Sequence, residues 1–190
     1  FISSLEGIED FTALDTLSCG VNQLTSLDVT QNTALTTLYC GVNQLTSLDI
    51  TQNAALTTLY CTSNQLTSLD ISQNTALTVL GCNYNQLTVL DVSLNTALTD
   101  LECNHNQLTS LDVSNNTNLD FLFCRGNQLS TLVVNNDIIW IWCDENELTS
   151  LDVSQCLYLE QLRSEFNKLT SLDLSPNISL GDELYLSNNE

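Results

Sequence analysis

The chain has 190 residues, and its 23 acidic residues outnumber only three basic ones, which gives a formal net charge of −20. Nucleic acid is excluded as a partner because contacts to phosphates need Lys and Arg side chains, and anionic membrane surfaces are disfavoured for the same reason. No apolar run approaches the roughly 18 residues of a membrane-spanning helix, so we expect no membrane insertion.

The chain is built from one repeated unit. Residues 1–13 match the second half of this unit, full repeats begin at positions 14, 35, 56, 77, 98, 119, 138 and 159, and a partial repeat covers 180–190. The period is 21 residues, but the repeat that begins at Leu119 is two residues shorter. A fixed period of this length indicates a solenoid, in which each turn packs only on its neighbours. We therefore expect a single elongated domain over residues 1–190.

Each repeat holds two short apolar pieces. In the repeat from Leu35, the first piece has Leu38 and Cys40 two positions apart. The second piece has Leu48 and Ile50 at the same spacing. Such alternation predicts β-strands whose intervening residues point outward, and no stretch shows a sustained helical spacing of apolar residues. The sequence therefore predicts short parallel strands on both faces of a flattened coil, with little or no α-helix.

The two pieces read L-x-x-L-x-C-x-x-N-x-L and L-x-x-L-D-V/I-x-x-N, and this pattern resembles the leucine-rich repeat, with Cys at the third apolar position. The 21-residue length is similar to the short bacterial class of these repeats, found in internalin-like surface and secreted proteins. The resemblance covers nearly the whole chain and implies a leucine-rich-repeat solenoid, a right-handed coil of horseshoe shape. It also implies a non-enzymatic module that binds proteins or glycans, although one fold hosts many functions.

The two ends of the sequence give further predictions. The sequence begins at Phe1 within a repeat, without Met and without a signal peptide. We expect a fragment of a longer protein that is extracellular or at the cell surface. Solenoid ends normally need caps, and only the N-terminal half-repeat resembles one. We expect a monomer, with end-to-end contacts through the uncapped C-terminus as the alternative.

One cysteine recurs at the same position of successive repeats and forms a Cys ladder. Metal-binding motifs usually place two Cys two to four residues apart, and no such pair occurs here, while parallel side chains on in-register strands disfavour disulfides. Ser164 and Leu186 fill this position in later repeats, so we interpret the Cys as small buried apolar residues and expect no metal and no cofactor. Cys156 stands apart, where other repeats have Asn, and has no obvious partner. The ladder comprises Cys19, Cys40, Cys61, Cys82, Cys103 and Cys124.

An Asn ladder follows three positions after the Cys ladder. In leucine-rich repeats this amide faces inward and bonds the backbone where the strand ends, and buried turn N–H and C=O groups need such partners. We therefore assign a structural role to Asn22, Asn43, Asn64, Asn85, Asn106, Asn127, Asn146 and Asn167.

Two further ladders lie in or beside the second piece. The Asp ladder is interrupted by Val133, and like charges one rung apart should raise one another's pKa. Calcium could relieve this repulsion, but the dense Asp/Gly pattern of calcium-binding repeats is missing, so we favour solvated carboxylates bonded to adjacent Thr or Ser. The Thr ladder keeps an ice-binding face open as a minor alternative. The members are Asp28, Asp49, Asp70, Asp91, Asp112, Asp152 and Asp173, and Thr25, Thr46, Thr67, Thr88, Thr109, Thr149 and Thr170.

The repeats differ most at the outward positions of the first piece and in the turn after it. Nine of the twelve aromatic residues fall there, together with both Arg and the only His. Phe121, Phe123, Trp140 and Trp142, here called the aromatic cluster, belong to adjacent repeats beside the deletion. Exposed aromatic residues next to Arg are typical of interaction hot spots. The resemblance makes this the concave face, with partner-binding candidates Tyr39, Tyr60, Tyr84, His105, Phe121, Phe123, Arg125, Trp140, Trp142, Arg163 and Phe166.

These candidates favour a non-catalytic recognition or adhesion module that binds a protein partner. A carbohydrate-binding module is the main alternative, because Tyr39, Tyr60, Phe123 and Trp142 would form an aromatic track on which sugars stack, although a gap separates Tyr60 from Phe123. A structural spacer without any ligand is a further alternative.

An enzyme is disfavoured. His105 lacks a nearby Cys or Ser nucleophile with a third orienting group. Asp100 and Glu102 resemble paired catalytic carboxylates, but they would lie on an open face without a pocket-forming insertion.

Overall fold

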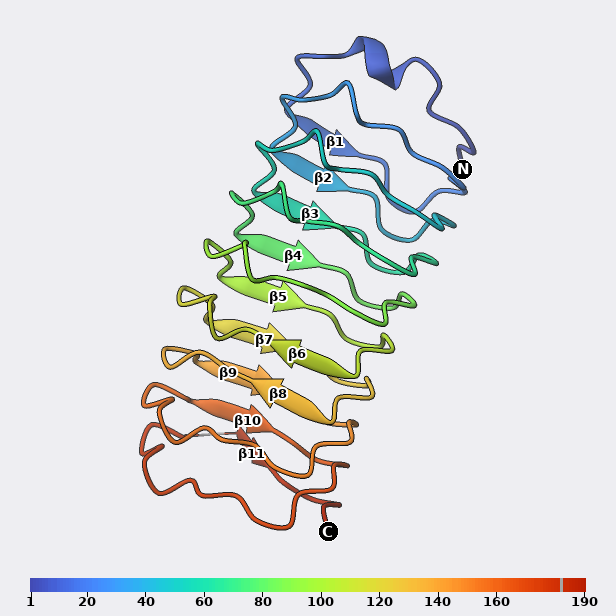
Figure 1. The fold of residues 1–190 in the computed structure, drawn as a ribbon. Coiled ribbons are helices and arrows are strands. Elements are labelled where there is room, and N and C mark those ends of the chain that lie inside the picture. Colours follow the sequence, from blue (N-terminus) through green and yellow to red (C-terminus); the bar gives the residue numbers. More distant parts are fainter. Residues whose placement is uncertain (182) are drawn as a thin grey trace.

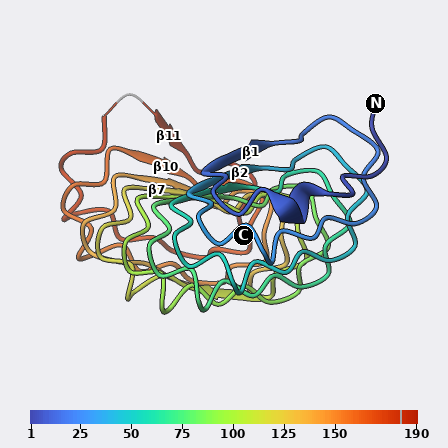
Figure 2. The same cartoon turned by 90° about the horizontal axis from the view of Figure 1, so that it is seen from above.

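The computed structural model describes residues 1–181 and 183–190 as an elongated stack of turns, with the two chain ends at opposite ends of the stack (Figure 1). Seen along the stack, successive turns lie behind one another as a flattened ring (Figure 2). The solenoid expected from the repeat period is therefore confirmed. Residue 182, which belongs to the partial repeat 180–190, lies outside the described residues.

One parallel sheet of nine strands runs the length of the stack, and each strand has three residues. Every strand pairs in register with the corresponding strand of the next turn, so that Tyr39 lies opposite Tyr60. The central residue, such as Leu38 with no exposed surface, points into the core, and its two neighbours point outward. In sheet order the strands are β1 (Thr16–Ser18), β2 (Thr37–Tyr39), β3 (Thr58–Tyr60), β4 (Val79–Gly81), β5 (Asp100–Glu102), β7 (Phe121–Phe123), β9 (Trp140–Trp142), β10 (Gln161–Arg163) and β11 (Glu183–Tyr185).

The opposite side of the stack has far less strand structure than the nine-stranded side. A second parallel sheet consists of β6 (Ser110–Asp112) and β8 (Thr131–Val133), which belongs to the shortened turn. An isolated bridge between Asp28 and Asp49 adds one further pair. Strands on both faces thus occur as predicted, but on the second face they are local. Within the described residues the one helical element is the 3-10 helix η1 (Ile8–Asp10), and no helix there combines the length and apolarity that crossing a membrane requires.

Rows of Leu, Val, Ile and Cys fill the interior. All eight Cys of the sequence lie in the described part, and all are buried and free. Desolvation raises the pKa of these thiols, to about 12 for Cys103 and Cys143, so the side chains stay protonated and apolar. Cys143 adds a seventh rung after the shortened turn. Its backbone N–H donates to the carbonyl of Arg163, just as the N–H of Cys124 donates to the carbonyl of Trp142. This packing agrees with the interpretation of the ladder as core residues.

The predicted Asn ladder joins each turn to the one before it. Asn43 shows the pattern: its Nδ2 donates to the carbonyls of Cys19 and Cys40, at 3.1 and 3.0 Å. Its Oδ1 accepts the N–H of Leu24 at 3.0 Å. One amide therefore satisfies backbone groups of two successive turns, which fixes their spacing.

A second Asn ladder does the same on the other side, and its structural role escaped the sequence analysis. Asn53 has no exposed surface, and its Nδ2 donates to the carbonyls of Val29 and Asn32 at 3.0 and 2.8 Å. In the shortened turn Asn135 keeps the rung, bonding Asn116 and Leu119. The equivalent residues are Asn32, Asn53, Asn74, Asn95, Asn116 and Asn177.

Cys156 takes the place of Asn in this second ladder. Like the other Cys, it has no cysteine partner among the described residues, and its thiol lies 3.3 Å from the carbonyl of Asn135 and donates a hydrogen bond to it. A weak sulfur donor thus replaces one amide bond, in the turn that follows the deletion.

Candidate functional site

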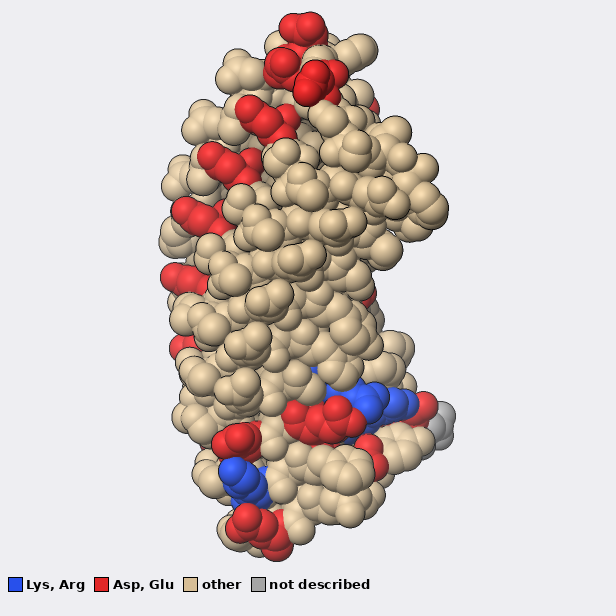
Figure 3. All heavy atoms as spheres, turned by 90° about the vertical axis from the view of Figure 1, so that its right-hand side faces the viewer, with Lys and Arg blue, Asp and Glu red and all other residues tan. Residues whose placement is uncertain are grey.

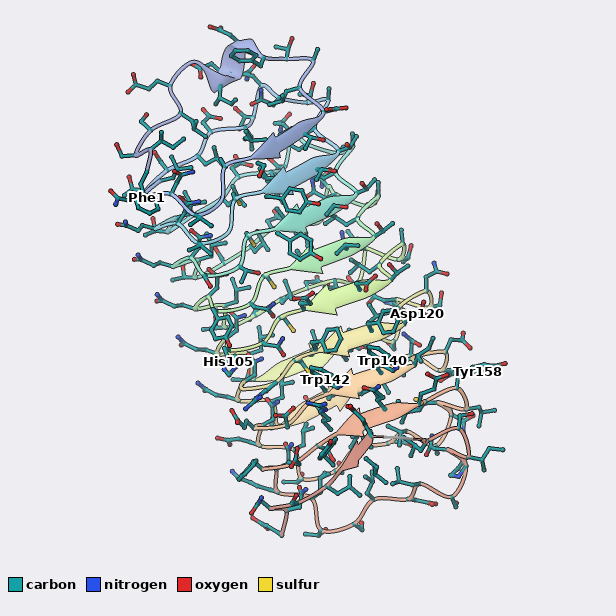
Figure 4. All side chains as sticks on the ribbon, turned by 180° about the vertical axis from the view of Figure 1, so that it is seen from behind. Phe1, His105, Asp120, Trp140, Trp142 and Tyr158 are labelled. Carbon is teal, nitrogen blue, oxygen red and sulfur yellow. The ribbon has the colours of Figure 1, made fainter. Side chains whose placement is uncertain are left out.

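The outward side chains of the nine-stranded sheet form one face of the stack, here called the sheet face. Figure 4 views this face with Trp140 and Trp142 labelled on β9. The register places Phe121 opposite Trp140 and Phe123 opposite Trp142. The predicted aromatic cluster is therefore brought together on two neighbouring strands.

The four rings of the aromatic cluster pack against one another in pairs. Phe121 meets Trp140 with ring centroids 4.8 Å apart, and Phe123 meets Trp142 at 4.7 Å, with interplanar angles of 61° and 74°. These are edge-to-face contacts, which add to the burial energy of the rings. The cluster was expected to be exposed, but each ring is half-buried because its neighbour covers it. The four rings thus form one packed surface in place of freely exposed rings.

Arg163 extends one row of the cluster across β10. Its guanidinium carbon lies 4.0 Å from the ring centroid of Trp142 and 4.9 Å from that of Tyr185. Its Nη2 also pairs with Glu183 at 2.6 Å. The row Phe123, Trp142, Arg163 and Tyr185 is thus held by aromatic and cation–π contacts. Tyr185 and Glu183 were missing from the predicted site, although Tyr185 lies in the same sequence column as Trp142.

Four of the remaining ring-bearing candidates form two stacked pairs, and Phe166 belongs to neither. Tyr39 and Tyr60 stack at 5.6 Å, and Tyr84 and His105 stack at 4.5 Å. The second ring of each pair lies over a glycine of the next turn, where a side chain would collide with it. A Cβ at Gly81 would lie 2.7 Å from a carbon of Tyr60. A Cβ at Gly126 would lie 2.8 Å from Cε1 of His105. The Tyr39–Tyr60 pair and the aromatic cluster are therefore separate, as the gap in the sequence track predicts.

The row that contains Tyr84 and His105 has an unusual backbone. Its residues have positive φ in every turn, between 51° and 64°, and only Gly126 is suited to that conformation on steric grounds. For other residues this conformation costs about 1–2 kcal/mol, and the β-branched Val21 and Val42 are clear outliers. The side chains project at the rim of the sheet face, where Tyr84 and Phe166 are more than half exposed. The sequence carries little sign of this strain, because its one glycine in the column is isolated.

All three basic residues are neutralised within the chain. Arg125 pairs with Asp144 through Nε at 3.0 Å and with Glu145 through Nη2 at 2.5 Å. Lys168 pairs with Glu147 at 3.1 Å, and Arg163 with Glu183. Figure 3 shows one edge of the stack, where basic side chains (blue) lie beside acidic ones (red) near the C-terminal end. The middle of that edge carries uncharged residues (tan).

Asp144 differs from the other carboxylates because it is buried beside Arg125. Desolvation raises its pKa, and this effect outweighs the lowering by the Arg125 guanidinium. The pKa of Glu145 is lowered instead, chiefly by its hydrogen bond from Arg125. One guanidinium therefore holds two carboxyl groups of different acidity at the rim.

The Asp ladder forms an acidic edge on the other side, visible as the red column at the left of Figure 3. Oδ1 of Asp28 accepts the N–H and the hydroxyl of Thr30, at 3.0 and 2.7 Å, and the later Asp residues accept the corresponding N–H. These bonds lower the pKa of the ladder carboxyls. The expectation of raised pKa values was wrong: at Asp49 the repulsion from Asp28 and Asp70 is smaller than the effect of the hydrogen bonds.

The predicted bonding of these carboxylates to adjacent Thr or Ser is what the structure shows. Across residues 1–181 and 183–190, no three His, Cys, Asp or Glu side chains are arranged to hold a metal ion.

Comparison with known proteins identifies the fold. No protein-family model and no curated protein sequence matches the chain. Among solved structures it is similar to the functional domain of InlJ from Listeria monocytogenes, which includes a cysteine ladder, with 36% identity, a TM-score of 0.76 and coverage of 98% of this chain and 46% of that one. A leucine-rich-repeat protein of Leptospira interrogans is 25% identical with a TM-score of 0.79, covering 100% of this chain and 59% of that chain.

A third similar structure is the leucine-rich-repeat ectodomain of the receptor kinase GASSHO1/SCHENGEN3 from Arabidopsis thaliana, with 24% identity, a TM-score of 0.80 and coverage of 93% of this chain and 24% of that one. The chain thus spans about half the length of the two bacterial structures. These similarities confirm the predicted fold class: the chain is a leucine-rich-repeat solenoid.

Proposed function

We propose that this chain is a non-catalytic recognition module that binds a protein partner through the sheet face, which is the concave face expected from the sequence. The row Phe123, Trp142, Arg163 and Tyr185 carries this proposal. Interfaces concentrate their binding energy in aromatic and Arg side chains that are already ordered before the partner arrives. Edge-to-face packing and the stacked guanidinium provide that order here.

Solved leucine-rich-repeat structures support a binding role in general terms. The plant ectodomain was solved in complex with CASPARIAN STRIP INTEGRITY FACTOR 2, and LRIM1 was solved in complex with APL1C. The identities to this chain are 24% and 22%, so these structures support the scaffold and not a particular partner. The same neighbours, a receptor ectodomain among them, support a location outside the cell or at its surface.

A carbohydrate ligand is the second candidate, favoured by the stacked pair Tyr39 and Tyr60. Tyr39 is 40% exposed, and a sugar ring could stack on that pair. The pair is short, however, because Gly81 and Glu102 follow it on β4 and β5.

The geometry around His105 supports the proposal of a non-enzymatic role. Its ring stacks on Tyr84 and lies close to Gly126, so the imidazole is engaged in packing. Asp100 and Glu102 each accept one hydrogen bond, from Thr99 and from Asn83, and stand side by side on an open sheet. Such an arrangement fits a binding surface better than an acid–base pair that closes around a substrate.

A pull-down from cell-surface and matrix material, with proteins and polysaccharides together, tests the proposal. Wild type would be compared with Phe123→Ala, Trp140→Ala, Trp142→Ala and with a control variant, Phe11→Ala, Tyr158→Ala, which removes exposed rings that are not on the strands of the sheet face. Folding of each variant would be checked by circular dichroism. A protein captured by wild type and control but lost by the folded triple variant is the expected result.

Other outcomes of this pull-down have definite meanings. Capture of a polysaccharide in the same pattern would favour the carbohydrate candidate. Equal capture by all three proteins would contradict the assignment of the sheet face. No capture by any of them would favour a spacer.

A further inference from the structure

The centre of the sheet face carries two carboxylates on β5, next to the aromatic strand β7. Asp100 and Glu102 are the outward residues of β5, which lies between β4 and β7 (Figure 1). The register places Phe121 beside Asp100 and Phe123 beside Glu102. On the opposite side, Gly81 is the neighbour of Glu102.

Gly81 brings a tyrosine to the same place. Tyr60 leans over it, and a side chain there would collide with the Tyr60 ring. Burial, and after it the negative charges of Glu102 and Asp100, raise the pKa of Tyr60, so the two carboxylates act on this ring across β4. The carboxylate pair is thus bordered by Tyr60 on one side and by Phe121 and Phe123 on the other.

The two carboxylates are held in place but not neutralised. Oδ2 of Asp100 accepts the hydroxyl of Thr99 at 2.6 Å, and Oε2 of Glu102 accepts Nδ2 of Asn83 at 2.6 Å. No ion pair involves either residue anywhere in residues 1–181 and 183–190, because the three basic side chains are paired with other carboxylates. The second oxygen of each group accepts no hydrogen bond from the described residues, so both remain available to a ligand.

Elsewhere on the same sheet, a similar group of aromatic rings and a carboxylate already binds a guanidinium. On β10, Arg163 stacks on Trp142 and Tyr185 and pairs with the carboxylate of Glu183. Aromatic rings and a carboxylate therefore enclose a guanidinium on this same sheet. The surroundings of β5 offer aromatic rings and two carboxylates without a guanidinium.

We propose that Asp100 and Glu102, between Tyr60 and Phe123, receive an arginine side chain of the protein partner. A guanidinium suits this place because it is planar, bonds carboxylates in a bidentate manner and stacks on aromatic rings. This inference rests on the proposed function and adds the chemistry that the partner must present. It places the contact in the middle of the sheet face, next to the aromatic cluster.

The test uses a random dodecapeptide display library as the probe. It is selected separately on wild type, on Asp100→Asn, Glu102→Gln, and on the control Asp70→Asn, Asp91→Asn, which removes the same charge from the acidic edge. Peptides recovered on wild type and control should be enriched several-fold in Arg over the input library. The double variant at β5 should return Arg to its input frequency. A recovered peptide, resynthesised, should bind the β5 variant at least about tenfold more weakly than the control.

Three results would overturn the inference: unchanged Arg enrichment on the β5 variant, an equal loss on the control, and recovery of no peptide by wild type. The substitutions are isosteric and lie at outward positions, and circular dichroism would verify the fold. The triple variant Phe123→Ala, Trp140→Ala, Trp142→Ala separates the two claims. If it abolishes peptide binding while the β5 variant does not, the proposed function stands and the arginine site fails. If neither variant changes peptide binding, both fail.

Discussion

The guanidinium carbon of Arg163 lies 4.0 Å from the ring centroid of Trp142, which belongs to the preceding strand of the sheet. Tyr185 covers the guanidinium from the following turn, and Glu183 neutralises it. A cation in this position is therefore part of the scaffold, and it fixes the Trp142 ring that a partner would contact. The proposed binding surface depends on this internal contact as well as on the exposed atoms.

Arg163→Ala should lower the free energy of unfolding by about 1 kcal/mol, because a stacked and partly desolvated cation–π contact is lost. Urea denaturation of the variant would measure this change. Lys168→Ala is the matched control, since it also removes a cation and an ion pair. The side chains of that pair, Lys168 and Glu147, are 47% and 54% exposed. The control should change stability by roughly 0–0.5 kcal/mol. Equal effects of both substitutions would show that the stacking contributes nothing.

Asn74→Ala should be far more destabilising than its position in a turn implies. The Asn74 side chain is fully buried and donates to the carbonyls of Ile50 and Asn53 at 3.0 and 2.8 Å. Removing it deletes two buried hydrogen bonds and leaves each carbonyl with one, from the N–H of Asn53 or of Leu56, at a cost of about 2 kcal/mol. The denaturation midpoint would be compared with that of Gln73→Ala, an exposed neighbour expected to be nearly neutral. A midpoint equal to that of the control would contradict the structural role of the second Asn ladder.

Stability should fall on acidification because of the Asp ladder. The folded pKa values are lowered by hydrogen bonds from Thr30, Thr51, Ser72 and their equivalents. The unfolded chain then binds more protons, so the stabilisation is present above the unfolded Asp pKa of about 3.9 and is lost as the pH falls below it. Thermal unfolding between pH 6 and pH 2.5 should show a weaker pH dependence for Asp70→Asn, Asp91→Asn than for wild type. Superimposable profiles would argue against this origin.

The Cys ladder should make the protein sensitive to alkali. Burial raises the folded pKa to about 12 for Cys103 and Cys143. An unfolded thiol titrates near 8.5, so the stabilisation is complete below about pH 8.5 and is lost progressively as the pH rises toward the folded values. Thermal unfolding from pH 7 to pH 10.5 would show this decline. At neutral pH all eight thiols should react with an aromatic disulfide reagent only on unfolding, and rapid labelling of the native protein would refute the buried arrangement.

The sequence predicted most of the fold because the solenoid is decided by spacing. The two-residue interval between Leu38 and Cys40 and the regular Asn43 position are enough to place a strand and a turn in every repeat. The extent of the second sheet was less accessible, since the repeated Leu-Asp-Val/Ile pattern forms a named strand only at β6, which pairs with β8, where Val133 replaces the Asp. That difference arises beside the shortened turn and depends on how neighbouring turns meet.

The candidate site was predicted by position but not by geometry. The columns around Trp142 located the sheet face, whereas the packing of Arg163 between two rings depends on rotamers that a pattern does not contain. The prediction of raised pKa values in the Asp ladder was wrong for a similar reason. Repulsion between rungs is visible in the sequence, but the two hydrogen bonds from Thr30 need a specific turn.

The positive-φ column at the rim has a consequence for how recognition can change. Every turn except that of Gly126 presents one side chain there on the same backbone, from Val21 through Tyr84 to Phe166. These side chains stand outside the core, so exchanging one leaves the Leu and Cys rows of the adjacent turns untouched. Any residue other than Gly already bears a similar steric cost at this position. Outside the coupled group Tyr84, His105 and Gly126, specificity can therefore be rewritten one turn at a time. Diversifying this column would turn the chain into a scaffold for selecting new binders.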